Sequence, residues 1–204
     1  MSFFDEMFLD SENTRTCYRQ YLDWLNAPEQ KNIAKRKDEA ESVFRRTGIT
    51  FNVYSEKEET EKLIPFDLIP RILNEEEWKT IKKGVEQRVR AINSFLFDIY
   101  HQQEIVKANI IPHYLINQNE AFLPEMIGFT PPSGIYTHVA GIDLVRTSES
   151  EFLVLEDNVR TPSGVSYMIE NRETMYNMFP ELFSKIKVRS VSYTHLRAHE
   201  TRTN

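Results

Sequence analysis

The chain has 204 residues, of which 40% are hydrophobic and 27% charged, a composition that fits a globular protein with a sizeable core and excludes a disordered or fibrous one. No apolar run is long enough for a membrane-spanning helix, the single cysteine, Cys17, excludes a disulfide framework, and the N-terminus lacks a secretion signal, so we expect a cytoplasmic protein. The net charge of -6 is unevenly distributed, because residues 185–204 carry five basic side chains and one acidic side chain. The rest of the chain is therefore strongly acidic and has no broad positive surface that would attract nucleic acid or an anionic membrane.

The first part of the chain is predicted to be mainly helical. Apolar residues recur at helical spacing over residues 15–25 and 29–47, and each segment is predicted to be a helix. Residues 49–54 alternate between apolar and polar side chains and indicate a strand, whereas the charged residues 56–62 are interpreted as a solvated loop. Residues 1–133 are therefore expected to form a mainly helical N-terminal region with a short strand near 49–54.

The longest predicted helix covers residues 74–100, where apolar residues follow one another at steps of three and four. Asn74 can cap this helix, and Glu77 follows at the spacing of a capping box. Arg88 and Arg90 lie within the helix and are interpreted as part of a solvated face, with a contribution to a neighbouring cleft as the alternative.

The last part of the body is predicted to be rich in β-structure. Strands are expected at residues 135–146 and 151–159, joined by a turn at 147–150, and a helix is expected at 166–179. These elements make residues 134–187 a second region, formed by a hairpin and the helix that follows it.

Pairing between the two strands is expected to start at the turn. If Arg146 pairs with Glu151, an antiparallel ladder pairs Asp143 with Val154. Because side chains alternate between the two faces of a strand, Glu156 lies on the same face as Val154 and therefore on the same face as Asp143. A register slip of one residue would separate the two carboxylates.

Three polar side chains, those of Asp143, Glu156 and Asn158, are thus expected on one face of the hairpin, with Asp157 on the other. Two carboxylates and an amide oxygen are the hard donors that Mg²⁺ prefers, and Mg²⁺ usually completes its shell with water and substrate phosphates. Without a cation the two carboxylates would repel each other, and one would take up a proton. The alternative interpretation is an ordinary hairpin whose acidic side chains face solvent.

The residues directly after the second strand suit an anion. Arg160 can form a bidentate contact with phosphate oxygens, and the turn Pro162-Ser163-Gly164 can present a hydroxyl and backbone N–H groups. No other stretch predicts chemistry as strongly, because the sequence lacks a glycine-rich phosphate loop, an H-E-x-x-H zinc motif and a G-x-S-x-G elbow.

Two stretches are specific enough to be compared with known protein families: His138-Val-Ala-Gly-Ile-Asp-Leu-Val-Arg146 and Leu155-Glu-Asp-Asn-Val-Arg-Thr-Pro-Ser-Gly-Val-Ser-Tyr167. Together with shorter matching segments they resemble the circularly permuted ATP-grasp proteins of type 2, over about residues 1–187. The E-D-N-x-R-T-P-S-G run is the most specific part. The shorter segments are residues 18–19, 48–54, 65–71, 87–93, 170–172 and 179–183.

The resemblance implies an ATP-dependent carboxylate–amine ligase, in which ATP phosphorylates a carboxylate and an amine then attacks the acyl phosphate to form an amide. It implies Mg²⁺ and ATP as cofactor and co-substrate. Peptide-like or small-molecule carboxylates and amines are the substrates that it suggests, and an α-helical partner protein is associated with the family.

The resemblance also assigns roles to single residues. Asp143, Glu156 and Asn158 match the Mg²⁺ ligands, which agrees with their expected common face. Arg160 matches the catalytic position that steadies the transferring phosphoryl group, with Thr161 beside it in nucleotide binding. Three small residues, Ser163, Gly164 and Ser166, match the region that binds the acceptor substrate.

In the permuted order, the nucleotide-clasping half should follow after about residue 190. We therefore expect an α+β fold, in which an N-terminal helical region and an antiparallel sheet form the truncated metal-binding part of the enzyme, and we expect this fragment alone to be inactive. Residues 188–204 match nothing expected of the family and are interpreted as a non-native or disordered tail, with a basic arm as the alternative.

Two other functions stay open at this point. One is a non-catalytic binding module that has kept the ATP-grasp-like fold. The other is a metal-dependent hydrolase that uses Asp143 and Glu156, although the sequence offers no convincing general base for it.

Overall fold

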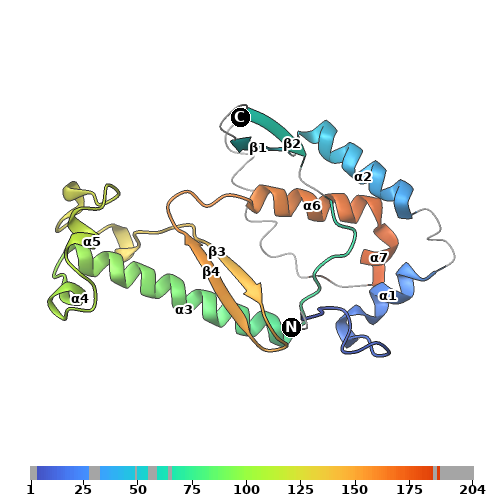
Figure 1. Cartoon of the computed structure of the whole chain (residues 1–204), viewed down its shortest axis with the longest axis horizontal. Coiled ribbons are helices and arrows are strands. Elements are labelled where there is room, and N and C mark those ends of the chain that lie inside the picture. The colour runs from blue at the N-terminus through green and yellow to red at the C-terminus, as the bar shows by residue number, and fades with distance from the viewer. Residues whose placement is uncertain are drawn as a thin grey trace. The chain divides into compact units, whose positions relative to one another are not determined.

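The computed structural model describes residues 4–27, 33–48, 50–54, 59–63, 66–185 and 188 (Figure 1). Its architecture is α+β, as the sequence predicts. Within the described residues the strands form two antiparallel hairpins, β1–β2 and β3–β4. The elements in chain order are η1 (Thr16–Tyr18), α1 (Arg19–Leu25), α2 (Ile33–Thr47), β1 (Thr50–Tyr54), β2 (Glu59–Leu63), α3 (Glu75–Tyr100), α4 (Glu104–Lys107), α5 (Tyr114–Asn117), η3 (Pro124–Met126), η4 (Pro132–Gly134), β3 (Gly141–Arg146), β4 (Phe152–Asn158), α6 (Val165–Met178) and α7 (Pro180–Lys185).

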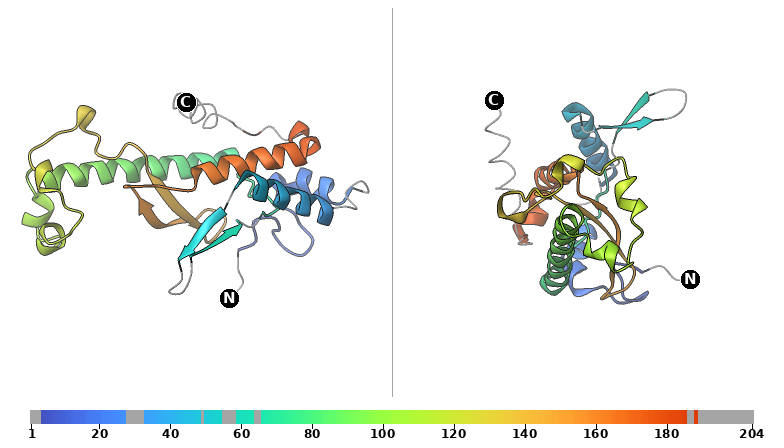
Figure 2. Two further views of the ribbon diagram at one scale, coloured as in Figure 1. Left: turned by 90° about the horizontal axis from the view of Figure 1, so that it is seen from above. Right: turned by 90° about the vertical axis from the view of Figure 1, so that its left-hand side faces the viewer.

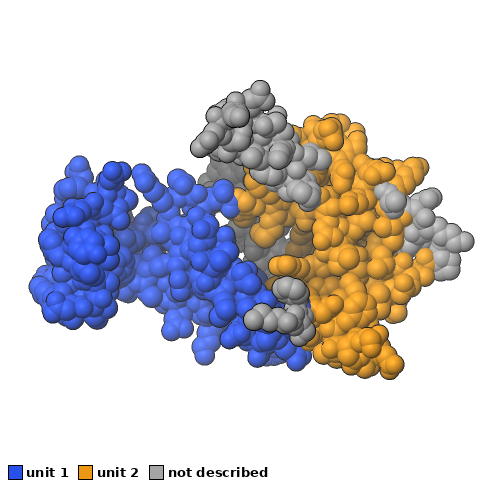
Figure 3. Space-filling view, in the orientation of Figure 1, with its two compact units in different colours: residues 1–4, 74–163 blue, residues 5–73, 164–204 orange. Residues whose placement is uncertain are grey.

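The chain divides into two compact units, which Figure 3 shows in different colours. The first unit contains residues 1–4 and 74–163, and the second contains residues 5–73 and 164–204. The chain therefore passes from one unit to the other after Phe4, after Leu73 and after Ser163.

From the sequence, the chain was predicted to divide into residues 1–133, 134–187 and 188–204. The boundaries of the two compact units lie at other positions. Of the third region only Val188 is described, so the predicted tail lies outside the described residues apart from that position.

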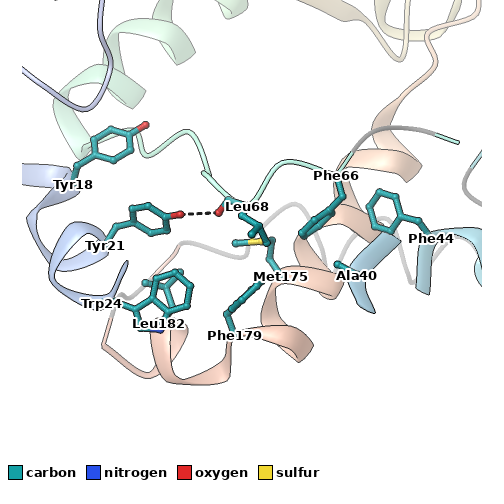
Figure 4. Close-up of a cluster of buried hydrophobic side chains, with 10 residues drawn as sticks. All are labelled: Tyr18, Tyr21, Trp24, Ala40, Phe44, Phe66, Leu68, Met175, Phe179 and Leu182. Carbon is teal, nitrogen blue, oxygen red and sulfur yellow. Dashed lines mark hydrogen bonds between the residues drawn. The ribbon is translucent and has the colours of Figure 1, made fainter. Parts of the chain in front are cut away.

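Aromatic side chains form the core of the second unit (Figure 4). Tyr21 and Trp24 come from α1, Phe44 comes from α2, and all three are buried. Trp24 meets the ring of Phe179 edge-on at 5.2 Å between centroids, and Phe44 meets Phe66 in the same way at 5.1 Å. Such edge-to-face pairs add to the stabilisation that burial of the rings provides. The other members of the cluster are Tyr18, Ala40, Leu68, Met175 and Leu182.

Two tyrosine hydroxyls hold the chain segment that enters this core after β2. The hydroxyl of Tyr21 donates to the Leu68 carbonyl oxygen at 2.9 Å. The hydroxyl of Tyr18 donates to the Pro70 carbonyl oxygen at 3.2 Å and accepts from the Ile72 N–H at 2.9 Å. Buried phenol groups and an irregular backbone segment thus satisfy each other, which allows the segment to lie against the core without regular secondary structure.

Burial raises the pKa of Tyr21 to about 12. Because the folded-state pKa is raised, the stability that Tyr21 contributes is complete below pH 10 and is lost as the pH rises through 12. Over that range we expect the free energy of unfolding of the wild-type chain to fall, relative to that of Tyr21→Phe, by on the order of 2 kcal/mol. Urea unfolding of both chains between pH 9 and pH 12 measures this, and a difference that stays constant with pH would contradict it.

The hairpin β1–β2 corrects one prediction. The strand expected near 49–54 is present as β1, but the charged residues 59–62, interpreted as part of a loop, belong to β2 and pair with β1. The loop prediction is wrong for these residues, because strand preference depends on a pairing partner more than on intrinsic propensity. Residues 55–58 lie outside the described part of the chain.

The long helix α3 of the first unit has the predicted capping box. The Asn74 side chain accepts a hydrogen bond from the Glu77 N–H at 2.9 Å, and the Glu77 side chain accepts one from the Asn74 N–H at 2.8 Å. The helix runs from Glu75 to Tyr100 and confirms the prediction over residues 74–100. Among the described residues, neither this helix nor any other combines the length and the apolar character needed to cross a membrane.

The C-terminal end of α3 organises the loops that lead into β3. Tyr100 stacks on Phe122 at 5.0 Å and on Tyr136 at 5.9 Å between ring centroids. The Asn93 side-chain oxygen accepts hydrogen bonds from the N–H groups of Tyr136 and Thr137 at 2.8 and 3.0 Å. These contacts tie the segment before β3 to α3, so the start of the hairpin is positioned by the helix.

The turn of the β3–β4 hairpin is tied to the first turn of α3 by Arg146. Its guanidinium donates to the Glu77 carboxylate at 2.6 Å and to the Ser148 and Glu149 carbonyl oxygens at 3.1 and 2.8 Å. The side chains of Arg146 and Glu77 are only 5% and 14% exposed. The guanidinium also lies over the ring of Phe152 at 5.2 Å. The hairpin therefore lies along the N-terminal half of α3, and the C-terminal half of the helix holds the segment that leads into β3 (Figures 1 and 2).

Candidate functional site

The ladder of the β3–β4 hairpin has a different register from the predicted one. Next to the turn, Arg146 pairs with Phe152, and at the other end Asp143 pairs with Glu156. Between these pairs, Leu155 has no partner and forms a β-bulge. The predicted pairs of Arg146 with Glu151 and of Asp143 with Val154 are wrong, because alternation alone cannot locate an inserted residue.

The bulge nevertheless leaves the predicted carboxylates on one face. Directly paired residues of an antiparallel ladder point to the same side, so Asp143 and Glu156 share a face. Asn158 pairs with Gly141 and lies on that face too, and its amide donates to the Glu156 carboxylate at 2.9 Å. The common face is as predicted, but the argument for it was wrong, since Val154 pairs with Leu144 on the opposite face.

The opposite face of the hairpin packs against α3. Asp157 points to this side, as predicted, and its two carboxylate oxygens accept hydrogen bonds from Nε and Nη2 of Arg88, each at 2.6 Å. Arg88 is exposed, as predicted, but its guanidinium also holds Asp157, a contact that was not predicted. Residues from both elements, including Ile81 and Val85 of α3 and Leu144 of β3, line the groove between them.

The hydrogen bonds from Arg88 hold the pKa of Asp157 below its usual range. A carboxyl whose folded-state pKa is lowered contributes its stability at neutral pH and loses it only as the pH falls through that lowered value. The Arg88–Asp157 pair is therefore fully charged at physiological pH.

The face that carries the three predicted ligands is open within the first unit. Asp143, Glu156 and Asn158 are all exposed. The same hairpin also carries exposed apolar side chains, with Leu153 49% and Leu155 72% exposed. Clusters of exposed apolar side chains around polar groups are typical of surfaces that bind a ligand or another protein segment.

The residues after β4 begin at the same end of the hairpin. Arg160, Thr161 and Ser163 are exposed and belong to the first unit. Arg160 is exposed, so an anion in solution can reach its side chain. The roles predicted for these three residues stay predictions.

Gly164 and Ser166 belong to the second unit, where they form the start of α6. Gly164 is the N-cap of this helix and has a φ of 91°, in the left-handed region that a side chain disfavours. The structure thus gives Gly164 a conformational role, and the substrate contacts predicted for Gly164 and Ser166 stay predictions.

At Gly141, β3 lies close to the segment that follows β4. A Cβ atom added there would lie 3.2 Å from Cβ of Pro162 and 3.5 Å from Cβ of Asn158. We expect Gly141→Ala to destabilise the chain by about 1 kcal/mol through overpacking and to weaken metal binding by displacing Asn158. Urea unfolding measures the first effect and calorimetry with Mg²⁺ the second.

Gly84 provides the matched control for Gly141→Ala. It lies within α3, and a Cβ atom there meets nothing within 4 Å. Gly84→Ala should stabilise the chain by up to about 1 kcal/mol through helix propensity. Equal effects of the two substitutions would contradict the steric argument at Gly141.

The chemistry of the donor set fits Mg²⁺ better than a transition metal. No group of three or more His, Cys, Asp and Glu side chains that could hold a metal ion occurs in the part of the chain that the structure describes. The predicted set differs from such a group, because it consists of two carboxylates and one amide oxygen. Such a hard, incomplete oxygen set suits Mg²⁺, which retains water and binds substrate phosphates.

Comparison with known proteins finds a family match over more than half of the chain. Residues 70–201 match the family described as circularly permuted ATP-grasp type 2. The match contains the whole β3–β4 hairpin and the Arg160-Thr-Pro-Ser-Gly164 segment, and it runs into the segment predicted to be a tail.

Relatives are found in several bacteria. An uncharacterized protein of Synechocystis sp. is 37% identical over 203 residues, which are 100% of this chain and 42% of the relative. An uncharacterized protein of Mycobacterium leprae is 41% identical over 188 residues, or 92% of this chain and 33% of the relative. A putative glutamate–cysteine ligase of Frankia casuarinae is 34% identical over 181 residues, or 88% of this chain and 20% of the relative.

This chain therefore spans less than half the length of these relatives. The family match nonetheless covers well over half of this chain and includes the site. The chain belongs to the circularly permuted ATP-grasp type 2 family.

Proposed function

We propose that this chain provides the Mg²⁺-binding part of an ATP-dependent carboxylate–amine ligase. The observation that carries the proposal is the direct pairing of Asp143 with Glu156 on the open face of the hairpin, with Asn158 beside them. Like charges placed opposite each other on neighbouring strands destabilise a hairpin, and a cation bound between them would remove that repulsion.

The three side chains would hold Mg²⁺ through one carboxylate oxygen of Asp143, one of Glu156 and the amide oxygen of Asn158. The amide N–H of Asn158 donates to Glu156, which leaves its oxygen available. When bound, the metal would supply neutralisation of the negative charge on the transferring phosphoryl group.

The remaining roles follow the order of residues along the chain. Arg160 would contact the phosphoryl oxygens as their charge redistributes, with Thr161 beside it as a donor to the nucleotide. The substrate carboxylate attacks the γ-phosphoryl group, and ADP leaves. The amine then attacks the acyl phosphate, inorganic phosphate leaves, and an amide forms. Ser163, Gly164 and Ser166 are proposed to bind the acceptor.

The names of relatives suggest the first substrates to test. The two Frankia relatives carry the name putative glutamate–cysteine ligase. Glutamate and cysteine are therefore the first pair to supply, followed by other amino acids and polyamines.

The binding test is calorimetry with ATP, with and without Mg²⁺, on this chain and on a longer chain with the remaining length of its relatives. Binding by the longer chain that needs Mg²⁺ supports the proposal. Tight ATP binding by this chain alone would show that the nucleotide site lies within it. If neither chain binds ATP, the ligase proposal is wrong.

A chemical test separates a ligase from a binding module. Hydroxylamine converts an acyl phosphate to a hydroxamate, so a ligase supplied with ATP, Mg²⁺ and its carboxylate yields hydroxamate and ADP in equal amounts. ATP binding without ADP release, across the whole panel of carboxylates, would favour the non-catalytic binding module.

A further inference from the structure

The β4 strand has two ways to pair with β3, and only one of them builds the open acidic face. In the observed ladder Leu155 is left out as a bulge, and Glu156 lies opposite Asp143. An uninterrupted ladder that continued from the pair Leu144–Val154 would place Leu155 opposite Asp143. Glu156 would then point to the α3 side, and Asp157 would point to the open face.

The bulge destabilises the hairpin, so another interaction must compensate for it. An inserted residue stays unpaired, interrupts the ladder hydrogen bonds and bends the strand. Leu155 gains little in return, since 72% of its surface remains exposed. The backbone and the bulged side chain therefore do not favour the observed register by themselves.

The Arg88–Asp157 pair is available only in the observed register. Nε of Arg88 reaches Oδ1 of Asp157, and Nη2 reaches Oδ2, both at 2.6 Å. This bidentate geometry is the strong form of an arginine–carboxylate contact. In the uninterrupted ladder, Asp157 would face away from α3, so the bidentate contact with Arg88 would be lost.

We propose that Arg88 is a positioning residue: by anchoring Asp157 to α3 it selects the bulged register and so keeps Glu156 and Asn158 on the face of Asp143. Arg88 does not touch the metal or the substrate in this scheme. It acts through the residue that separates the two proposed ligands of β4. The inference rests on the proposed function for the metal-binding consequence, whereas the register itself can be measured without a metal.

The first experiment measures Mn²⁺ binding to this chain by electron paramagnetic resonance, with Mn²⁺ as a stand-in for Mg²⁺. Arg88→Met should weaken Mn²⁺ binding at least tenfold, because loss of a residue that supports a metal ligand usually lowers metal affinity by about 10- to 100-fold. Arg88→Lys should restore part of the affinity, because it keeps the charge but loses the bidentate geometry.

Deletion of Leu155 distinguishes a positioning role of Arg88 from a role in general stability. Without Leu155, Glu156 follows Val154 directly and pairs with Asp143 in an uninterrupted ladder, so the number of residues alone fixes the register. In this background Arg88→Met should change Mn²⁺ affinity less than twofold. Equal losses with and without Leu155 would overturn the inference, because Arg88 would then act through general stability.

Glu156→Gln separates failure of the inference from failure of the proposed function. If Glu156→Gln abolishes Mn²⁺ binding while Arg88→Met leaves it unchanged, the metal site stands and the positioning role is wrong. If the wild-type chain does not bind Mn²⁺, or Glu156→Gln does not change the binding, the metal site is wrong and the metal-binding part of the inference falls with it.

Nuclear magnetic resonance decides the register itself, whatever the metal result. The wild-type hairpin should show cross-strand contacts between Asp143 and Glu156, and Arg88→Met should shift them to Asp143 and Leu155. An unchanged register in Arg88→Met overturns the proposal. If Arg88→Met does not fold, the exchanged pair Arg88→Asp with Asp157→Arg takes its place and should keep the wild-type contacts.

Discussion

Glu156→Gln is expected to abolish Mg²⁺ binding, with a loss of at least 100-fold, while leaving the metal-free hairpin intact. Glutamine keeps the length of the side chain and its hydrogen bond with Asn158, but it removes one of the two negative charges that face each other across the ladder. Because like charges opposite each other destabilise a hairpin, the metal-free variant should be as stable as the wild type or more stable by about 0.2–1 kcal/mol. Calorimetry and urea unfolding measure the two effects.

The opposite signs of these two effects make the prediction specific. A residue that serves only the fold would lower stability and binding together. Glu151→Gln is the matched control, since it removes the same charge near the turn of the same hairpin and should leave Mg²⁺ affinity unchanged. Loss of stability in Glu156→Gln, without loss of Mg²⁺ binding, would contradict the role proposed for this carboxylate.

Arg146→Met is expected to lower the free energy of unfolding by about 3 kcal/mol, the scale observed when one partner of a buried ion pair is removed. Arg146 joins three elements, because its guanidinium meets the Glu77 carboxylate, the turn carbonyl oxygens and the Phe152 ring. Methionine fills part of the volume but leaves Glu77 without its cation in a site that is 14% exposed. Denaturant unfolding followed by circular dichroism measures the loss.

A double variant tests the cause of this loss. Arg146→Met combined with Glu77→Gln removes both charges, so the pair should recover part of the stability that Arg146→Met loses. Arg146→Lys keeps the charge and should lose less. If the double variant equals the sum of the two single variants, Glu77 and Arg146 are not coupled and the argument from the ion pair is wrong.

Local signals predicted the parts of the fold that local interactions determine. The capping box of α3 was visible as Asn74 followed three residues later by Glu77, and the side chains make those hydrogen bonds. The common face of Glu156 and Asn158 follows from strand alternation alone. Features of this kind depend on residues at most a few positions apart, so one sequence suffices to predict them.

The parts that the sequence did not predict depend on residues far apart. The bulge at Leu155 leaves no local signature, because whether a strand accepts an extra residue depends on what its two faces meet. The face of Asp157 was predicted correctly, but its partner Arg88, which lies 69 positions earlier, was not predicted. One physical signal was available: a carboxylate that is partly buried against a helix is stabilised by a cation on that helix.

The order of the two units along the chain has a consequence for biosynthesis. Tyr21, Trp24 and Phe44 are made early, but the side chains that cover them, Met175 and Phe179, come from the far end of the chain. At about 5–20 residues per second, the ribosome needs roughly 7–27 s to pass from Phe44 to Phe179. Residues 74–163 form a compact unit of their own and can fold during that interval. The nascent chain should therefore complete its acidic hairpin first, while its early aromatic side chains wait exposed, and this is the stage at which a chaperone would be most useful to it.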